Sequence, residues 1–432
     1  MSNQQKNILV RLAWIAVLVL QACNFKNDSQ DNLLFWSSNN APEMEFTQKV
    51  IRDWNQAHPD EQIDFQPVPE GQSSEEIILA AVVGRTTPDI YASMWPGDVP
   101  IYADAKKLVP LDTLDGFLEF IYQRCDSSLI EEITFDDGHI YQVPWKMNPL
   151  MMIYNKKIIN QLGLEKSPGT YSGYLEAAEK FKKDRDGDGY VDQWIGYTEV
   201  KVIWRQRLMN FYPLYLAASG GAPLIKNNKA AFNNQHAIEV FAFLGELYKK
   251  EYYSKERMSA RQDPFLASDI ATKITGPWEI EHSNKFKPEG FEFGFAPIPV
   301  PDHYKGPVYS SADSKSIVIF DTCKKPGVAW EFLRTMIDSK NDLLFLTLSN
   351  QLPHRKNLLD NPDFFKFFEN NPMMVQFAEQ AKHVKRVDNS MVLKEVLDLI
   401  SQEYEASVIY GIKSPEDAIS DAARAADLLL LK

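Results

Sequence analysis

Five tryptophans lie in or beside loops of the predicted fold, where their flat apolar faces could hold a ligand. They are Trp36, Trp95, Trp145, Trp204 and Trp278. Such faces suit the C–H surfaces of sugar rings, and planar polar groups around them suit hydroxyls. The polar candidates are Ser38, Asn39, Asp98, Asn148 and Arg355, with Glu279 as a weaker one. A single tryptophan in such a loop often serves packing instead, so a structural role stays open for each.

An acidic loop has the spacing of a calcium site. Its candidate ligands are Asp184, Asp186, Asp188, the carbonyl of Tyr190, and Asp192. They match positions 1, 3, 5, 7 and 9 of an EF-hand loop, with glycine at position 6. Position 12 is Ile195 rather than glutamate, so the loop does not close as an EF-hand does. A structural Ca²⁺ is one interpretation and a solvated acidic turn is the other; no other cofactor is predicted.

Catalytic motifs are absent from the sequence. Its seven histidines form no HExxH pattern, and neither a GxSxG nor a P-loop occurs. Glu131-Glu132 and Asp136-Asp137 could be glycosidase carboxylates, but adjacent acids point in different directions and usually mark a solvated face. A non-enzymatic protein is predicted, with an extracytoplasmic carbohydrate-active hydrolase as the alternative.

The first 22 residues have the composition of a signal peptide. Lys6 and Arg11 are their only charges, and an apolar run from Leu12 to Leu20 follows, too short to span a bilayer as a helix. Ala22 precedes Cys23, as in a bacterial lipobox, so Cys23 is predicted to carry lipid and residues 23–32 to form a tether. The sequence thus predicts an extracytoplasmic, membrane-anchored protein.

The charge balance excludes one class of partner. The net charge is −13, and removing residues 1–22 with Lys6 and Arg11 makes it −15. Nucleic-acid binding needs a basic surface, so it is not expected. Cys125 and Cys323 could form one disulfide outside the cytoplasm or remain two buried thiols, and the second interpretation is favoured.

Strands and helices alternate after the tether. Strands are predicted at Leu33–Trp36, Ile63–Val68 and Asp89–Met94, with an amphipathic helix in each interval. Ligands of doubly wound α/β sheets bind beyond the carboxyl ends of the strands. The loops Ser37–Asn40 and Trp95–Asp98 are therefore expected to line a site.

A series of landmarks follows in a fixed order. They are Leu33–Asn39, Thr87–Ile90, Tyr141–Trp145, Met152–Lys157, Leu162-Gly163, Tyr171–Phe181, Thr275–Trp278, Ala296–Pro299, Pro326–Ile337 and Leu352–Arg355. In this order they resemble the bacterial extracellular solute-binding proteins that include maltose-binding protein, and the likeness covers nearly all of the chain after Cys23.

The resemblance implies a two-lobed α/β fold of the periplasmic-binding-protein type II class, each lobe a doubly wound sheet with flanking helices. The implied boundaries are 31–143 with 298–322 for the first lobe, 144–297 with 323–432 for the second, and hinge crossings near 142–146 and 296–301.

The resemblance also implies a function. A monomer anchored by Cys23 would capture a sugar or oligosaccharide between its lobes and deliver it to the permease subunits of an ABC importer. One departure bears on the cargo, because Asn148 stands where the resemblance implies a carboxylate that touches sugar hydroxyls. A polyamine or another small non-sugar solute is the alternative ligand, since aromatic boxes also bind cations.

Overall fold

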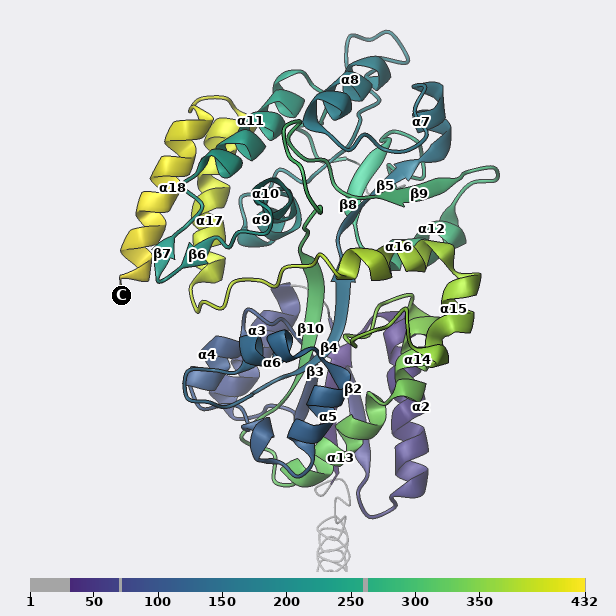
Figure 1. Ribbon diagram of the computed structural model, residues 1–432, viewed down its shortest axis with the longest axis vertical. Coiled ribbons are helices and arrows are strands. Elements are labelled where there is room, and N and C mark those ends of the chain that lie inside the picture. Colours follow the sequence, from purple (N-terminus) through teal and green to yellow (C-terminus); the bar gives the residue numbers. More distant parts are fainter. Residues whose placement is uncertain (1–31, 70–71, 259–262, 432) are drawn as a thin grey trace, which may run out of the picture.

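The computed structural model describes residues 32–69, 72–258 and 263–431. The predicted signal peptide, the lipidation site Cys23 and residues 24–31 of the tether lie outside these residues. Figure 1 shows two lobes, one above the other, with strands and loops running between them. Among the described residues, no helix is long and apolar enough to cross a bilayer.

A five-stranded sheet with the order β2-β1-β3-β10-β4 forms the centre of the first lobe. Its strands are β1 (Leu33–Ser38), β2 (Ile63–Val68), β3 (Ile90–Met94), β4 (Val143–Pro149) and β10 (Ala312–Ile319). β1 pairs in parallel with β2 and β3, whereas β10 runs antiparallel to β3 and β4. The helices that follow these strands are α2 (Ala41–Ala57), α3 (Gln72–Gly84), α4 (Val99–Asp104), α5 (Phe117–Arg124) and α6 (Ser127–Ile133).

The second lobe has a smaller sheet with the order β8-β5-β9. Its strands are β5 (Met151–Asn155), β8 (Thr272–Thr275) and β9 (Phe293–Ala296). β5 runs antiparallel to both neighbours, so the two-lobed α/β fold is confirmed but this sheet is not doubly wound. A short hairpin, β6 (Ile225–Lys226) and β7 (Lys229–Ala230), lies beside the C-terminal helix. The helices are α7 (Lys156–Gln161), α8 (Tyr171–Phe181), α9 (Trp204–Met209), α10 (Phe211–Ser219), α11 (Gln235–Lys249), α12 (Trp278–Phe286), α15 (Phe365–Asn370), α16 (Pro372–Ala381), α17 (Leu393–Tyr404) and α18 (Pro415–Leu430).

Two later helices, α13 (Pro326–Met336) and α14 (Ser339–Ser349), pack on the first lobe, although the predicted boundary placed them in the second. Phe332 contacts Phe35 of β1 edge to face, with ring centroids 5.7 Å apart, and its centroid is 5.5 Å from that of Trp54 in α2. The apolar stripe of α13 thus fills the core over the first sheet (Figure 1). The helical periodicity of its apolar residues predicts which face of α13 is buried, but it does not predict which lobe that face packs against.

The described chain passes between the lobes at three places, and the predicted hinges are displaced. The first predicted crossing lies inside β4, which pairs with β10, and the chain changes lobe only between Pro149 and Met151. The second comes after Val300, whose backbone still bonds to the second lobe at Tyr171, and before β10. The third comes after Lys356, whose backbone N–H still donates to the Arg124 carbonyl of the first lobe, and before α16, which packs on the second-lobe sheet.

Both described cysteines, Cys125 and Cys323, are free and buried. Burial raises the pKa of Cys125 to about 11, so its thiol is protonated at neutral pH. Of the two interpretations left open by the sequence, the buried thiols are confirmed.

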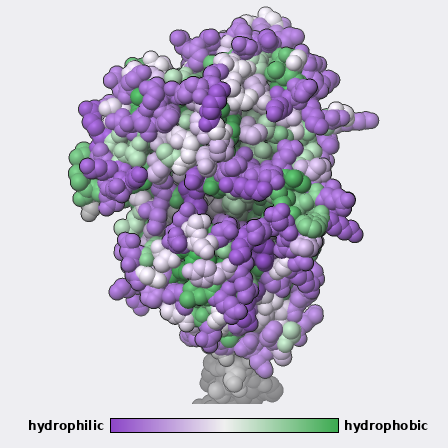
Figure 2. Space-filling model, viewed as in Figure 1, coloured by the Kyte–Doolittle hydropathy of each residue, from purple (hydrophilic) through white to green (hydrophobic). Residues whose placement is uncertain are grey.

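The visible surface is mostly hydrophilic, with small apolar patches (Figure 2). One patch lies at the edge near α18, where Leu428 is 68% exposed and Leu431 is 79% exposed. The large apolar side chains mostly pack inside the two lobes, in separate cores.

Candidate ligand-binding cleft

A cavity of about 610 Å³ lies between the lobes. The first lobe contributes residues from the ends of β1 and β3, the first turns of α2 and α3, and strands β4 and β10. The second lobe contributes α9, α12 and Asp263. The carboxyl ends of β1 and β3 therefore meet at the site, as expected for an α/β lobe.

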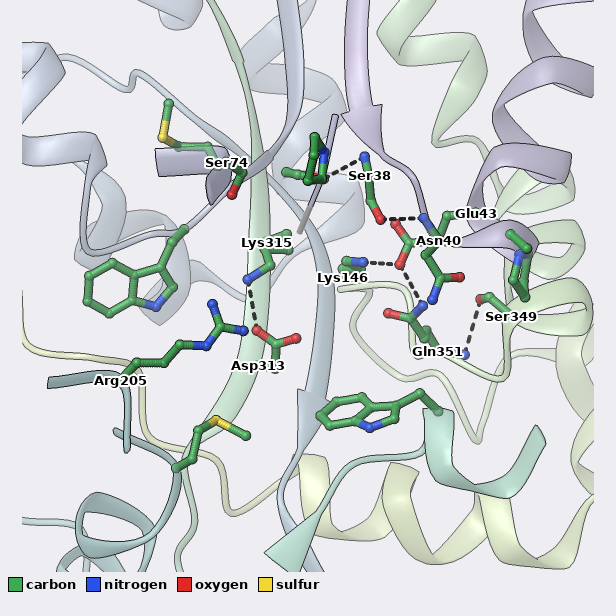
Figure 3. A pocket seen from close by; sticks show the side chains of 18 of the residues that line it. Ser38, Asn40, Glu43, Ser74, Lys146, Arg205, Asp313, Lys315, Ser349 and Gln351 are labelled. Atoms are coloured by element: carbon green, nitrogen blue, oxygen red, sulfur yellow. Dashed lines mark hydrogen bonds and ion pairs between the residues drawn. The ribbon is translucent and has the colours of Figure 1, made fainter. Parts of the chain in front are cut away.

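Strand alternation places an acid and a base together on the cavity wall. Asp313 and Lys315 are two residues apart in β10 and so share one face of the sheet, and Lys146 of β4 is the register partner of Lys315. The Lys315 ammonium lies 2.9 Å from a carboxylate oxygen of Asp313. Figure 3 shows Arg205 of α9 extending toward the same carboxylate from the second lobe.

These cations keep Asp313 ionised. Burial alone would raise the pKa of Asp313, but the positive charges of Lys315, Lys146 and Arg205 hold it below its ordinary value. The side chain remains 34% exposed, so the carboxylate can still accept hydrogen bonds from a ligand.

A second polar group surrounds Glu43, in the first turn of α2. Glu43 is 1% exposed and accepts hydrogen bonds from the ammonium of Lys146 and, at 2.6 Å, from the amide of Gln351 (Figure 3). Its other oxygen, Oε2, and Oδ1 of Asn40 are buried and accept no hydrogen bond from the described residues. Both side chains line the cavity, so these unsatisfied acceptors lie at its wall.

Trp278 is the partly exposed indole of the second-lobe wall. It is the first residue of α12, and its ring lies against Gly276, where an added Cβ would come within 2.1 Å of the ring. Glycine at this position is therefore required for the ring to take this position. The partly exposed indole gives the cleft a flat apolar surface.

The opposite end of the cleft contains two indoles in contact. Trp95, after β3, and Trp204, at the start of α9, have ring centroids 5.1 Å apart. Lys394 of α17 lies over both rings, 5.3 Å and 4.9 Å from their centroids. The two indoles are only 7% and 8% exposed, so their faces are largely covered by each other and by this ammonium.

Five of the predicted ligand-binding residues line the cavity. They are Ser38, Trp95, Asp98, Trp204 and Trp278, together with the weaker candidate Glu279. Burial raises the pKa of Asp98 to about 6, while the charge of Lys394 acts in the opposite direction. Glu279 accepts a hydrogen bond from Ser283 at 2.9 Å and lies 3.1 Å from the ammonium of Lys273.

The other five do not line the cavity, and the structure shows what they contact instead. Trp36 packs in the first-lobe core and Asn39 is exposed beside the cleft. Trp145 is fully buried against Phe345, with ring centroids 5.1 Å apart.

Asn148 and Arg355 hold the third crossing in place. Asn148 is fully buried, donates to Gln351 at 2.8 Å and accepts the Leu352 N–H at 3.1 Å. Arg355 donates to the buried Asp342 at 2.7 Å. Arg355 lines a different cavity from the one between the lobes. Asn148 is the register partner of Asp313, whose carboxylate lies on the cavity wall.

Several polar residues of the site were not predicted. They are Glu43, Lys146, Arg205, Asp313, Lys315 and Gln351, whereas Asn40 belongs to the loop Ser37–Asn40 that was expected to line the site. Asp313 and Lys315 are two residues apart, the spacing that puts two side chains on one face of a strand, but no strand was predicted at these residues. No sequence pattern brings Glu43, Lys146 and Gln351 together, since they come from distant segments.

The predicted calcium loop lies in the second lobe after α8 and does not line the cavity. Carboxylate oxygens of Asp184, Asp186 and Asp188 lie within 4.8 Å of one another. Asp192 instead accepts the backbone N–H of Arg185 at 2.7 Å. Three converging carboxylates are compatible with a cation, so calcium stays a prediction.

A second group with metal-ligand chemistry, Asp263, Glu279 and His282, lies on the cleft wall. The ammonium of Lys273 is 3.2 Å from Asp263 and 3.1 Å from Glu279. This lysine already supplies the positive charge that the two carboxylates require.

Comparison with known proteins agrees with this architecture. The model of the bacterial extracellular solute-binding proteins matches residues 37–342. A maltotriose-binding protein of Pyrococcus abyssi is 22% identical over 356 residues, which cover 81% of this chain and 72% of the relative.

Solved structures are similar over almost the whole chain. An uncharacterised protein of Listeria monocytogenes superposes with a TM-score of 0.77 at 25% identity, covering 93% of this chain and 100% of that one. The cyclic alpha-maltosyl-1,6-maltose binding protein of Arthrobacter globiformis gives a TM-score of 0.76 at 20% identity, covering 92% and 98%. With most of its length matched by the family model, the chain belongs to the bacterial extracellular solute-binding proteins.

Proposed function

We propose that this protein captures an oligosaccharide in the cleft between its lobes and delivers it to an ABC importer. The observation that carries the proposal is the pairing of a partly exposed indole, Trp278, with buried unpaired acceptors on Asn40 and Glu43. An indole face suits the C–H surface of a sugar ring, and free acceptors suit its hydroxyls. Asp313 with Arg205 adds a charged acceptor beside a charged donor.

The charge of the cleft favours a neutral ligand over an anion. Seven carboxylates line the cavity against four lysine and arginine side chains. Lys273 and Lys394, directly behind the wall, pair with four of these carboxylates, so an anion finds no excess of positive charge, whereas neutral hydroxyls can use both kinds of group. Names of the relatives support the same class, since the Pyrococcus protein is named for maltotriose and the Arthrobacter protein for a cyclic maltosyl-maltose.

A polyamine is the less favoured ligand. The arrangement that would bind an ammonium, two indoles with Asp98 and Glu75, is occupied by the ammonium of Lys394. A cationic ligand would have to displace this side chain and leave it without its carboxylate partners.

Ligand class is tested by a thermal-shift screen of residues 24–432 against maltotriose, arabino-oligosaccharides, glucose and spermidine. We expect at least one oligosaccharide to raise the melting temperature and spermidine to leave it unchanged. The reverse pattern would refute the carbohydrate proposal. Sugars recovered after long incubation should be intact, and turnover would identify a hydrolase instead.

Trp278→Ala tests the stacking surface by calorimetric titration with the best oligosaccharide of the screen. Loss of the aromatic face should weaken binding about 5- to 150-fold, if stacking on this indole contributes the roughly 1–3 kcal/mol that a ring stacked on an aromatic side chain contributes elsewhere. Trp194→Ala is the matched control, because Trp194 is also partly exposed but does not line the cavity. Equal affinities of the two variants would remove Trp278 from the site.

Anchoring and delivery complete the proposal. Cys23 is the proposed acylation site, supported by the apolar run and the small residue before it. Labelling with a fatty-acid analogue in cells should mark the wild-type chain and not Cys23→Ala; equal labelling would exclude this anchor. Light scattering of the purified chain checks the proposed monomer, and co-purification with permease subunits checks delivery.

A further inference from the structure

A single lysine of the second lobe is bound by two carboxylates of the first. The ammonium of Lys394, on α17, lies 2.6 Å from Oδ1 of Asp98 and 2.7 Å from Oε2 of Glu75. Lys394 is 22% exposed, and Asp98 and Glu75 are 7% and 22% exposed, so the contact is shielded from water. A charge pair in such surroundings is weakened less by salt than a surface pair.

The second lobe prepares its half of this contact. Lys394 and Asp398 are four residues apart in α17 and therefore lie on one helix face. Asp398 accepts the backbone N–H of Trp204, which fixes the start of α9 against α17. The same helix face thus positions both the lysine and the indole beneath its ammonium.

The first lobe prepares the other half through the turn after β3. Asp98 N–H donates to the Trp95 carbonyl at 2.9 Å, and Gly97 lies against the Trp95 ring, where a Cβ would come within 2.3 Å of it. Asp98 precedes α4 but its side chain makes no capping hydrogen bond. Its carboxylate is directed to Lys394 instead of to its own helix.

The contact closes one end of the cleft. Glu75, Trp95, Asp98 and Trp204 all line the cavity. Figure 3 places Ser74 and Arg205, the chain neighbours of Glu75 and Trp204, on one side of Asp313, and Glu43 and Gln351 on the other. The two lobes therefore touch at the Ser74–Arg205 end through groups of the protein itself.

We propose that Lys394 is an interlobe latch, which stabilises the closed arrangement of the lobes through Asp98 and Glu75 whether or not cargo is present. Separating the lobes would expose Trp95 and Trp204 and leave Lys394 without both carboxylates. The contact of Lys394 with its two carboxylates then supplies part of the free energy that closes the lobes. A bound ligand must supply only the rest of that free energy.

The test measures the distance between spin labels on the two lobes of the ligand-free protein by pulsed electron resonance. Lys394→Met keeps the aliphatic stem and removes the charge, and it should raise the ratio of open to closed molecules about 5- to 30-fold. Lys413→Met is the matched control. Lys413 also lies 2.6 Å and 2.7 Å from two carboxylates, Glu403 and Asp421, but all three belong to the second lobe.

Charge reversal distinguishes a latch from a packing residue. Lys394→Glu should open the lobes further, and adding Glu75→Lys should restore part of the closed population. The pair of variants Asp98→Asn and Glu75→Gln tests the same contact from the first lobe if the α17 variants fail to fold. Distance distributions that are the same in Lys394→Met and Lys413→Met, or no recovery in the reversed pair, would overturn the proposal. No sugar enters these measurements, so their failure leaves the carbohydrate proposal untouched.

Discussion

Replacing Asp313 by asparagine separates the role of its charge from that of its shape. The carboxylate stands between Lys315, 2.9 Å away, and Arg205, and it is 34% exposed to the cavity. Asparagine keeps the size of the side chain and one acceptor but loses the negative charge. We therefore expect the fold to persist and oligosaccharide binding to weaken.

The magnitude follows from the kind of bond that is lost. A hydrogen bond to a charged group contributes roughly 1.5–3 kcal/mol, and each 1.4 kcal/mol is about tenfold in affinity. The dissociation constant should therefore rise about 10- to 150-fold. Since neighbouring cations hold the pKa of Asp313 below its ordinary value of 3.8, the wild-type protein should keep its affinity as the pH falls from 7 to 5, as far as this group is concerned.

The assay is calorimetric titration with the best oligosaccharide of the thermal-shift screen. Asp302→Asn is the control, because Asp302 bonds to Ser172 on the second lobe and does not line the cavity. Near-ultraviolet circular dichroism checks that both variants fold. If both bind within twofold of the wild type, Asp313 is no ligand contact and the proposed geometry of the site is wrong.

Three further predictions concern stability. Asp342→Asn should lower the free energy of unfolding by about 3–5 kcal/mol in urea titration, because it strips a buried carboxylate from Arg124 and Arg355; a loss below about 1 kcal/mol would contradict this. The pKa of His354 is lowered from 6.5 to about 3 by burial and by nearby arginine charges, so the unfolded chain binds the proton more readily and stability falls as the pH falls through this window. His354→Asn should therefore lose stability less steeply between pH 6.5 and 4, by at most about 1.4 kcal/mol per pH unit, and parallel curves would refute it. We propose that Ca²⁺ binds the acidic loop, where three carboxylates converge, so millimolar Ca²⁺ should raise the melting temperature of the wild type but not of Asp186→Asn, whereas equal shifts would place the ion elsewhere.

The first half of the fold could be predicted because its signals are local. Strand β2 coincides with its predicted span, Ile63–Val68, β1 and β3 lie within two residues of theirs, and their carboxyl ends line the cavity. The lobe assignment of α13 and α14 could not be predicted, because an amphipathic helix specifies a buried face but not its partner. The hinge positions failed for a similar reason, since β4 is extended chain on both sides of Pro144 and Trp145 and only its pairing with β10 assigns it to the first lobe.

The site was predicted where a loop follows a strand and missed where the geometry is long-range. Trp95, Asp98 and Trp278 lie on or directly after turns whose glycines and prolines are visible in the sequence. Arg355 was assigned to the ligand from a short motif, but a guanidinium near a buried carboxylate binds that carboxylate first. Glu43 and Lys146 are 103 residues apart, and only the folded sheet brings them together.

The late position of α13 and α14 also bears on how the chain is made. The core of the first lobe needs Phe332 and Trp330, yet residues 150–311 of the second lobe are synthesised before them. At ribosomal speed, about 10–40 s separate the end of β4 from the end of α14. The first sheet lacks β10 until residue 319 is made and lacks α13 and α14 until residue 349 is made, so the amino-terminal half cannot complete its core alone. If the chain must cross a membrane unfolded, this delay keeps it unfolded for longer and so leaves more time for transport.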